Sequence, residues 1–370
     1  MSRARPAVMI MGKWRSQQPK SHDHQSAAGT HGEAGGSRGE GGARGDGGGF
    51  RGENRGPRRR WAPERALWAV VPPSVLVVTG IFSVQFGAGL AAKLFAQIPP
   101  AGVTALRLWT SAVVMVLVGA RPLRNVVSGV VRRRAWREAA VVIAFGLTLA
   151  IMNFSIYQSF ARIPLGISVT VEFLGPLGVA VASSRRVLDL LWVGLAGAGV
   201  VLLTRGGAAL SHGSAPGGGG RGEVVAGLAF ALLAGLAWAA YILLSRATGQ
   251  RFPGSTGLAI AMVVAAIAIT PVGVAAGHAA LLRPTVLLTG LAIGLLSSII
   301  PYSLELEALR RIPARVFGIW MSLEPAAAAL VGLVILGQAL AVREWIAIGC
   351  VMVACAGAAR GAREPQAPEA

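Results

Sequence analysis

The stretch "FSIYQSFARIPLG" (residues 154–166) decides the fold, because it recurs as "SLELEALRRIPAR" (303–315) after a shift of 149 residues. The same shift aligns Pro164 with Pro313 and Pro176 with Pro325. Similarity of a chain to itself at one fixed shift indicates internal duplication. We therefore predict two copies of one structural unit.

The composition shows what kind of unit is duplicated. Of the 370 residues, 54% are hydrophobic and only 14% are charged, whereas a soluble domain carries about 25% charged residues. From residue 66 onward, apolar runs recur at about the 20-residue length that a membrane-spanning helix needs. The sequence predicts an all-α membrane protein with ten transmembrane helices, at 66–86, 101–120, 139–159, 165–183, 187–204, 224–244, 256–276, 286–307, 315–336 and 342–359.

Ten spans and one duplication give two repeats of five helices, 66–204 and 224–360, joined by the glycine-rich linker 205–223. Because five is odd, the second repeat must enter the membrane from the opposite side. Inverted repeats of this kind build transporters with a binding site near the middle of the membrane. A duplication that serves packing alone is the alternative, and the buried acids described below favour transport.

The positive charges predict the orientation. Thirteen arginines fall in the predicted inner loops, and two more lie just before the C-terminal tail (361–370) and within it, Arg360 and Arg363, against six basic residues in the outer loops. Basic residues concentrate in cytoplasmic loops. We therefore expect a multi-pass protein with both termini in the cytoplasm.

The N-terminal segment, residues 1–65, is rich in glycine and arginine and almost without aliphatic side chains. Such a composition cannot bury enough apolar surface to fold, so a disordered cytoplasmic tail is expected. Arginines in such a tail can bind RNA or anionic lipid. A solvated tail that helps to set the topology is the favoured interpretation, and no nucleic-acid partner is expected despite the net charge of +19.

Three carboxylates lie inside predicted spans. Glu172 lies four residues before Pro176, Glu324 lies directly before Pro325, and Glu305 lies in the eighth span. Placing a charged side chain at a helix centre costs roughly 2.5–3.5 kcal/mol on insertion scales, and such residues usually face a cavity or a partner. Each could exchange a proton or bind a cationic substrate. The alternative is a protonated side chain that hydrogen-bonds to a neighbouring helix.

Glu172 and Glu324 come from different repeats, and we expect them to approach each other near the middle of the membrane. They are not equivalent under the 149-residue shift, which places Glu324 on Gly175, so the predicted site is asymmetric. Glu307 differs from these acids, because it lies three and four residues before Arg310 and Arg311. This spacing favours an ion pair at the membrane edge.

Other polar side chains mark the same spans as candidate lining of a substrate path. Tyr302 lies three residues before Glu305 on one helical face, and Asn153 and Tyr157 form a polar stripe on the third span. Arg107 lies within two turns of an outer helix end; it either binds the substrate carboxylate, gates the path, or extends to the lipid headgroups. Two isolated polar residues complete the candidate set: Gln85 and Tyr241.

Signatures of enzymes are missing from the sequence. There is no HExxH motif, no phosphate-binding GxxxxGK[ST] loop, and no histidine in any predicted span. We therefore expect no catalytic residues, no metal site and no cofactor.

Several segments resemble the EamA type of the drug/metabolite transporter superfamily, and within it the bacterial inner-membrane exporters of threonine and homoserine. The resemblance covers about residues 75–360. It is carried by "SVQFGAGLAAKLF" (83–95), "PAGVTALRL" (100–108), "MNFSIYQS" (152–159), "IPLGISVTVEFLGPLGVAVASSRR" (163–186), "PYSLE" (301–305) and "MSLEPA" (321–326). One departure is "LGQAL", in which Gln338 stands where the family often has glutamate.

The resemblance implies an exporter whose central cavity is lined by the first four helices of each repeat, with the fifth and tenth helices peripheral. It implies export of small amino acids at the expense of the proton gradient. The residues that stand in matching motifs are Gln85, Arg107, Asn153, Tyr157, Glu172, Tyr241, Glu305 and Glu324. The expected partners are a small zwitterionic amino acid, protons and membrane lipid. Alternatives are export of another metabolite or drug, and a membrane scaffold that anchors the arginine-rich tail.

Overall fold

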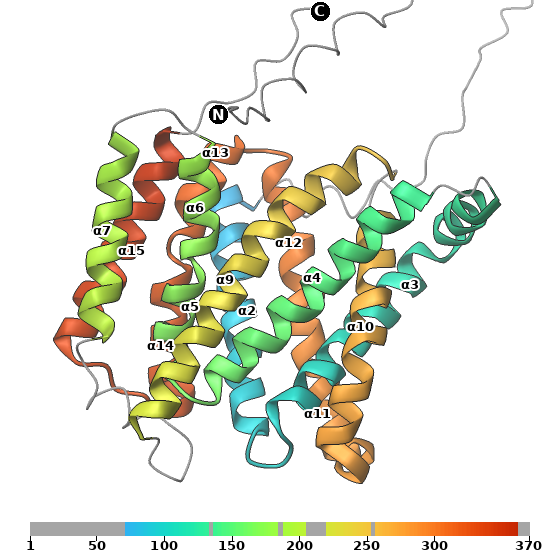
Figure 1. Cartoon of the computed structure of the whole chain (residues 1–370), viewed down its shortest axis with the longest axis horizontal. Helices are drawn as coiled ribbons and strands as arrows, with labels where there is room; N and C mark the ends of the chain where they lie inside the picture. Colours follow the sequence, from blue (N-terminus) through green and yellow to red (C-terminus); the bar gives the residue numbers. More distant parts are fainter. Residues whose placement is uncertain (1–70, 133–135, 184–187, 205–219, 253–255, 362–370) are drawn as a thin grey trace, which may run out of the picture. The chain divides into compact units, whose positions relative to one another are not determined.

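The computed structural model describes residues 71–132, 136–183, 188–204, 220–252 and 256–361. Every regular element in these residues is a helix (Figure 1), which confirms the predicted all-α class. Nine helical segments in the described ranges are long and apolar enough to cross a membrane. Helix α7 (Leu188–Thr204) is a shorter apolar helix of 17 residues. The predicted N-terminal tail, nearly all of the linker and nearly all of the C-terminal tail lie outside the described residues.

The first described helix of the first half begins later than the sequence predicted. The predicted span 66–86 is wrong in its limits, because α2 runs from Pro73 to Leu94. Pro72 precedes it with an extended backbone, as proline imposes on the residue before it, and proline is favoured at the first helical position. The other helices of this half are α3 (Pro100–Arg132), α4 (Trp136–Phe160), α5 (Leu165–Glu172), α6 (Leu174–Ala182) and α7.

The second half repeats this order. It contains α9 (Arg221–Gly249), α10 (Thr256–Gly277), η1 (His278–Leu282), α11 (Pro284–Gly294), η2 (Leu295–Ile299), α12 (Ile300–Leu309), α13 (Ala314–Met321), α14 (Glu324–Leu336) and α15 (Val342–Gly361). Because α9 already begins at Arg221, the last three residues of the predicted linker are helical. Segment η2 is a single turn of π-helix between α11 and α12.

The fourth and ninth predicted spans are each broken into two short helices. Helices α5 and α13 both have eight residues and both begin directly after the repeated prolines, Pro164 and Pro313. Helices α6 and α14 follow after the break, and each carries a proline near its start. A proline has no N–H to offer the carbonyl four residues earlier, so Pro176 and Pro325 leave carbonyl groups free at the breaks. The two acids Glu172 and Glu324 lie at these breaks.

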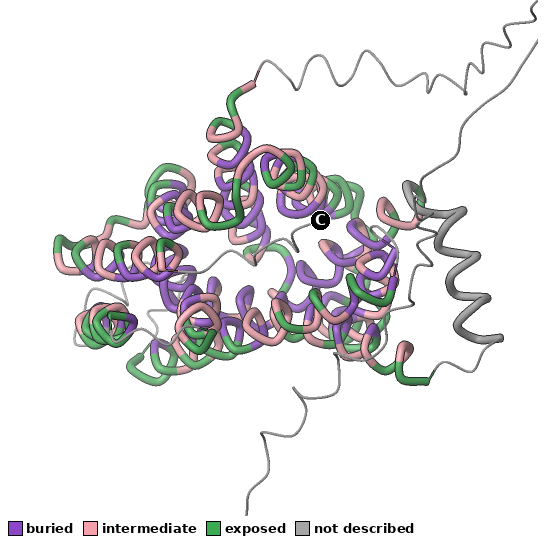
Figure 2. Tube along the Cα trace, turned by 90° about the horizontal axis from the view of Figure 1, so that it is seen from above, coloured by how far each residue is buried: buried purple, intermediate pink, exposed green. Residues whose placement is uncertain are grey.

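The helices pair across the two halves. Helix α4 runs along α9, α3 along α10, α2 against α12 and α14, α5 along α14, and α7 along α15 (Figure 1). Buried residues gather on the faces that the helices turn toward one another, and exposed residues lie on the outer faces (Figure 2). Large apolar side chains on the outer faces, such as Leu191 on α7 and Leu236 on α9, are 59% and 68% exposed. A surface of this kind suits lipid, and the protein is a multi-pass membrane protein.

Candidate functional site

The candidate site begins at the break before α14, where Glu324 is the first helical residue. Its side chain is buried, and its Oε1 accepts a hydrogen bond of 3.0 Å from Nε2 of the buried Gln85 on α2. The other carboxylate oxygen, Oε2, has no hydrogen-bond partner among the described residues. The structure thus joins two candidate residues that are 239 positions apart in the chain.

Two further carboxylates face the same place. Glu172 is the last residue of α5 and is buried. Glu305 of α12 lies against Gly80 of α2, where an added Cβ atom would be 3.6 Å from the Glu305 Cγ atom. The charge of Glu324 interacts with the charges of both Glu172 and Glu305. We call Glu172, Glu305 and Glu324 the carboxylate cluster; its members come from α5, α12 and α14.

Arg107 on α3 is the cation that faces the carboxylate cluster. Its Nη1 donates a hydrogen bond of 3.4 Å to the Tyr157 hydroxyl, and its Nη2 donates one of 3.1 Å to the carbonyl of Ser297. The guanidinium lies 5.5 Å from the centre of the Tyr157 ring, and its charge interacts with that of Glu172. The alternative that Arg107 extends to the lipid headgroups is therefore wrong, because the side chain turns inward to these acceptors.

Sequence reasoning missed Ser297, although a signal was present. Pro301 cannot donate to the carbonyl four residues earlier, which is that of Ser297, and this is the carbonyl that Arg107 uses. In the same π-helical turn, the carbonyl of Leu296 accepts a hydrogen bond of 2.8 Å from the Ser83 hydroxyl. π-Helical turns often occur at functional sites. Here η2 exposes backbone oxygens that side chains from α2 and α3 bind.

The tyrosines extend the site toward α9. Tyr241 of α9 and Tyr302 of α12 pack in one apolar cluster together with Phe145 of α4. The rings of Tyr241 and Phe145 have their centres 5.2 Å apart. The phenol groups of Tyr241 and Tyr302 lie near each other, and both lie near Glu305. The predicted placement of Tyr302 beside Glu305 thus fits the structure.

Two other sequence-based assignments have different outcomes. Asn153 is buried one turn from Tyr157, but its Nδ2 donates a hydrogen bond of 2.8 Å to the carbonyl of Leu149 on its own helix. The structure does not bring its amide nitrogen to the carboxylate cluster. The ion pair predicted for Glu307 is confirmed, with oxygen–nitrogen distances of 3.2 Å to Arg310 and 2.5 Å to Arg311.

A close approach of two helices holds the break beside Glu172. An added Cβ atom on Gly175 of α6 would lie 1.9 Å from the Gly235 carbonyl oxygen, and one on Gly235 of α9 would lie 2.7 Å from the Glu172 carbonyl oxygen. Neither position has room for a side chain. This carbonyl of Glu172 is the one that Pro176 leaves without a helical donor.

The charges define what the site can bind. Glu172 and Glu324 both interact with the guanidinium of Arg107, and Glu305 adds a third carboxylate near Glu324. A buried charge without a partner costs several kcal/mol. Positive charge from protons or from a bound ammonium group would balance the excess, while Arg107 offers N–H donors to an anion. No group of three histidine, cysteine, aspartate or glutamate residues in the described part of the chain is arranged to hold a metal ion. The arrangement suits a small molecule that carries both charges.

Comparisons with known proteins place this geometry in a family. Residues 225–360 match the EamA-like transporter family. The chain is 38% identical to the threonine/homoserine exporter RhtA of Escherichia coli K12 over 285 residues, which cover 77% of this chain and 90% of that protein. It is also 38% identical to RhtA of Salmonella typhimurium SL1344 over 298 residues, covering 80% of this chain and 94% of the relative.

A more distant relative and one solved structure extend the comparison. An uncharacterised transporter of Bacillus subtilis, YwfM, is 32% identical over 129 residues, covering 35% of this chain and 44% of that protein. One solved crystal structure superposes with a TM-score of 0.50 and 19% identity, covering 78% of this chain and 96% of that chain. At this identity the likeness concerns the fold alone.

Proposed function

The chain belongs to the EamA-like transporter family, and from this membership we propose that it is a secondary active exporter of small amino acids of the threonine and homoserine type. The relatives named as threonine/homoserine exporters align over at least 90% of their length. The observation that carries the proposal is the carboxylate cluster facing Arg107, because a zwitterion needs partners of both signs. This transporter role is favoured over a scaffold for the tail, and it requires no enzymatic chemistry.

The proposed architecture has ten spans in two inverted repeats. Helix α7, with 17 residues, is about 25 Å long at 1.5 Å per residue and lies at the short end of the range for a span. The pairings support the inversion, since α4 with α9 has its counterpart in α12 with α2, and α6 with α9 has its counterpart in α14 with α2. A two-fold relation between the halves predicts such pairs. We place both termini in the cytoplasm and the protein in the inner membrane.

The substrate is proposed to bind between the carboxylate cluster and Arg107. Its ammonium group would lie against Glu172 or Glu324, and its carboxylate against the guanidinium of Arg107, which can bind a carboxylate with two parallel hydrogen bonds. A side-chain hydroxyl of threonine or homoserine would find an acceptor or donor in Tyr157. Asn153, whose carbonyl oxygen remains available after its N–H bonds to Leu149, is a second candidate for that hydroxyl.

Coupling to protons follows from competition at one carboxylate. A proton and the ammonium group of the substrate neutralise the same negative charge. Binding both leaves an excess positive charge, binding neither leaves an unpaired negative charge, and either state is costly in a buried site. If protons enter from outside when the amino acid leaves, the proton gradient drives export. Glu172 is the proposed coupling residue, because helix α5 contains no basic residue and the cation that interacts with Glu172, Arg107, lies on α3.

The test uses the purified chain in liposomes with an imposed pH gradient and labelled L-threonine. Glu172→Gln imitates a carboxyl group that is permanently protonated, so gradient-driven flux should fall to the level of liposomes without protein. Glu307→Gln is the matched control: it removes a glutamate of the edge ion pair and should leave the flux nearly unchanged. Normal gradient-driven flux through Glu172→Gln would move the coupling role to Glu305 or Glu324. Absence of threonine and homoserine flux in the unaltered protein would reject the substrate.

A further inference from the structure

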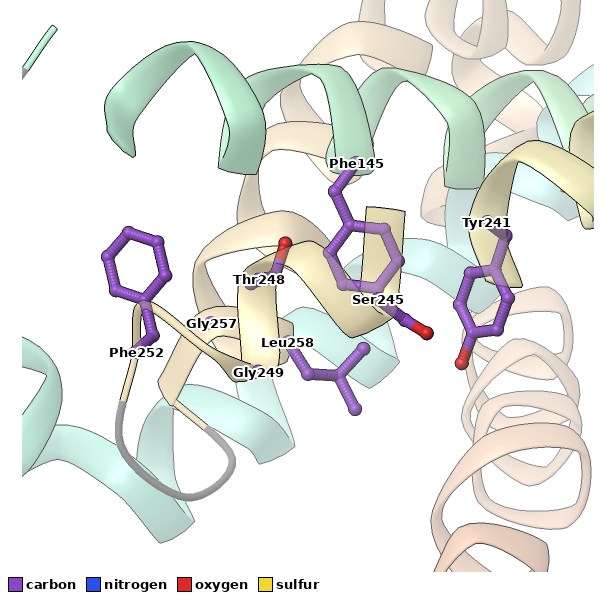
Figure 3. Close-up of a pocket in the computed structure, with 8 residues that line it drawn as sticks. All are labelled: Phe145, Tyr241, Ser245, Thr248, Gly249, Phe252, Gly257 and Leu258. Atoms are coloured by element: carbon purple, nitrogen blue, oxygen red, sulfur yellow. The ribbon is translucent and has the colours of Figure 1, made fainter. Parts of the chain in front are cut away.

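A cavity lies outside the carboxylate cluster, between α4, α9 and α10. It has a volume of about 110 Å³ and is partly open. Figure 3 shows Tyr241, Ser245 and Thr248 following one another along α9, with the ring of Phe145 reaching in from α4 and Leu258 from α10. The proposed function does not use this cavity.

The chemistry of the cavity is neutral and rich in hydroxyl groups. None of the residues that line it carries a formal charge. Thr248 is 2% exposed, and its Oγ1 has no hydrogen-bond partner among the described residues. The hydroxyl of Ser245 donates to the carbonyl of Ile242 at 3.1 Å, so its oxygen remains able to accept a hydrogen bond. A buried hydroxyl without a partner is costly, so Thr248 would gain a hydrogen bond from a ligand whose hydroxyl group reaches it.

The size of the cavity limits what can enter. One water needs roughly 10–15 Å³ of such space, and an engineered cavity of about 150 Å³ holds benzene. A cavity of 110 Å³ is therefore large enough for the side chain of a small amino acid and too small to enclose a drug-sized molecule. The charged ammonium and carboxylate groups of such a ligand would remain hydrated at the open side.

Tyr241 belongs to both the cavity and the surroundings of the carboxylate cluster. It lines the cavity beside Phe145, and it packs in one apolar cluster with Tyr302, three residues before Glu305. Tyr241 thus borders the hydroxyl-lined cavity and packs in the same apolar cluster as a residue one helical turn from Glu305. The α9 end that carries the cavity also carries the exposed Arg246 and Arg251, and basic residues favour the cytoplasmic side.

We propose that this cavity is a loading site, in which the hydroxylated side chain of a small amino acid binds from the cytoplasm before it passes Tyr241 to the carboxylate cluster. The proposal rests on the exporter function. In this proposal, Ser245 and Thr248 recognise the hydroxyl group of the amino acid. Tyr241 separates the loading site from the carboxylate cluster. The two ends of the path then have different chemistry: neutral hydrogen-bonding groups at the loading site and charges at the carboxylate cluster.

The first test is protection from thiol labelling. Ser245→Cys is made in the full-length chain with Cys350 and Cys355 replaced by alanine, and a membrane-impermeant thiol reagent is applied to inside-out vesicles. L-threonine at about ten times its dissociation constant leaves a site free about one tenth of the time, so labelling should slow about tenfold. Gln250→Cys is the control: it directly follows α9 at the same helix end, its wild-type side chain is exposed, and its labelling should not respond to threonine.

The outcomes separate this inference from the proposed function. Suppose that the Ser245→Cys variant still exports threonine but that threonine does not slow its labelling. This result would overturn the loading site and leave the proposed exporter function intact. Labelling only from the outer face would also overturn it. Lack of efflux by the unaltered chain would instead reject the exporter, and the loading site with it.

A second variant tests the inference should Ser245→Cys not fold. Thr248→Val removes the hydroxyl and keeps the shape, and loss of one hydrogen bond should raise the half-saturating cytoplasmic threonine concentration about two- to tenfold. The maximal rate should be unchanged, and Thr248→Ser should restore the wild-type value. An unchanged half-saturating concentration in Thr248→Val would contradict a role of this hydroxyl in binding.

Discussion

The close approach of α6 and α9 beside Glu172 gives a prediction for both the stability and the transport activity of the protein. In Gly175→Ala, the new Cβ atom would start 1.9 Å from the carbonyl oxygen of Gly235, whereas real Cβ atoms essentially never come closer than 3.0 Å. The obstacle is backbone rather than the end of a flexible side chain. The two helices must therefore separate by at least about 1.1 Å, the difference between these distances.

This separation sets the magnitude. Forcing extra volume into a packed interior costs about 1–3 kcal/mol. The separation of α6 from α9 also disturbs the break between α5 and α6, where Glu172 lies. Alanine is also a better helix former than glycine by roughly 0.5–1 kcal/mol, which offsets part of this cost. We expect Gly175→Ala to lose about 1–2 kcal/mol of unfolding free energy and to transport poorly.

Gly178→Ala on the same helix is the matched control. An added Cβ atom there meets no atom within 4 Å, so only the gain in helix propensity remains, and the variant should be unchanged or slightly stabilised. Unfolding free energies are measured by titrating detergent-solubilised protein with a denaturing detergent and following helicity, and L-threonine flux is measured in liposomes. Equal stability and equal flux for the two variants would refute the close packing of α6 on α9.

Three further perturbations test the site and the topology. Gln85→Leu removes the donor to Oε1 of Glu324 and should cost about 1–3 kcal/mol of unfolding free energy; stability equal to wild type would contradict this hydrogen bond. Arg107→Lys loses the planar guanidinium that reaches two acceptors, including the Ser297 carbonyl, and should lower threonine flux about tenfold; full flux would show that a point charge suffices. A reporter fused after Gly219 should read as external, and a cytoplasmic signal would reject the inverted repeats.

Part of the site was predictable from sequence because an acid in an apolar span is conspicuous. Glu172, Glu305 and Glu324 were identified on that ground, and spacing alone identified the ion pair of Glu307. The partners of these acids were not predictable. Gln85 is 239 residues from Glu324, and no local pattern connects residues so far apart.

Sequence patterns failed where the two faces of a helix are chemically alike. In a soluble helix the apolar face shows which side is buried, but lipid is as apolar as the protein interior. Arg107 was therefore left between the headgroups and the interior, and only the structure shows it bound to Tyr157 and Ser297. The loading cavity around Tyr241 was unforeseen for the same reason.

The sequence by itself determined the membrane class, the duplication and the acids, because each is a property of composition or of local spacing. The length of a span follows from the thickness of the bilayer, and a repeat is detected by aligning the sequence with itself. The tertiary structure decided which helices pair and which way their polar groups point. It joined Gln85 to Glu324 and directed Arg107 to the carbonyl that Pro301 leaves free. Those choices depend on contacts between distant segments, which balance buried charge and satisfy backbone groups where lipid offers no hydrogen bonds.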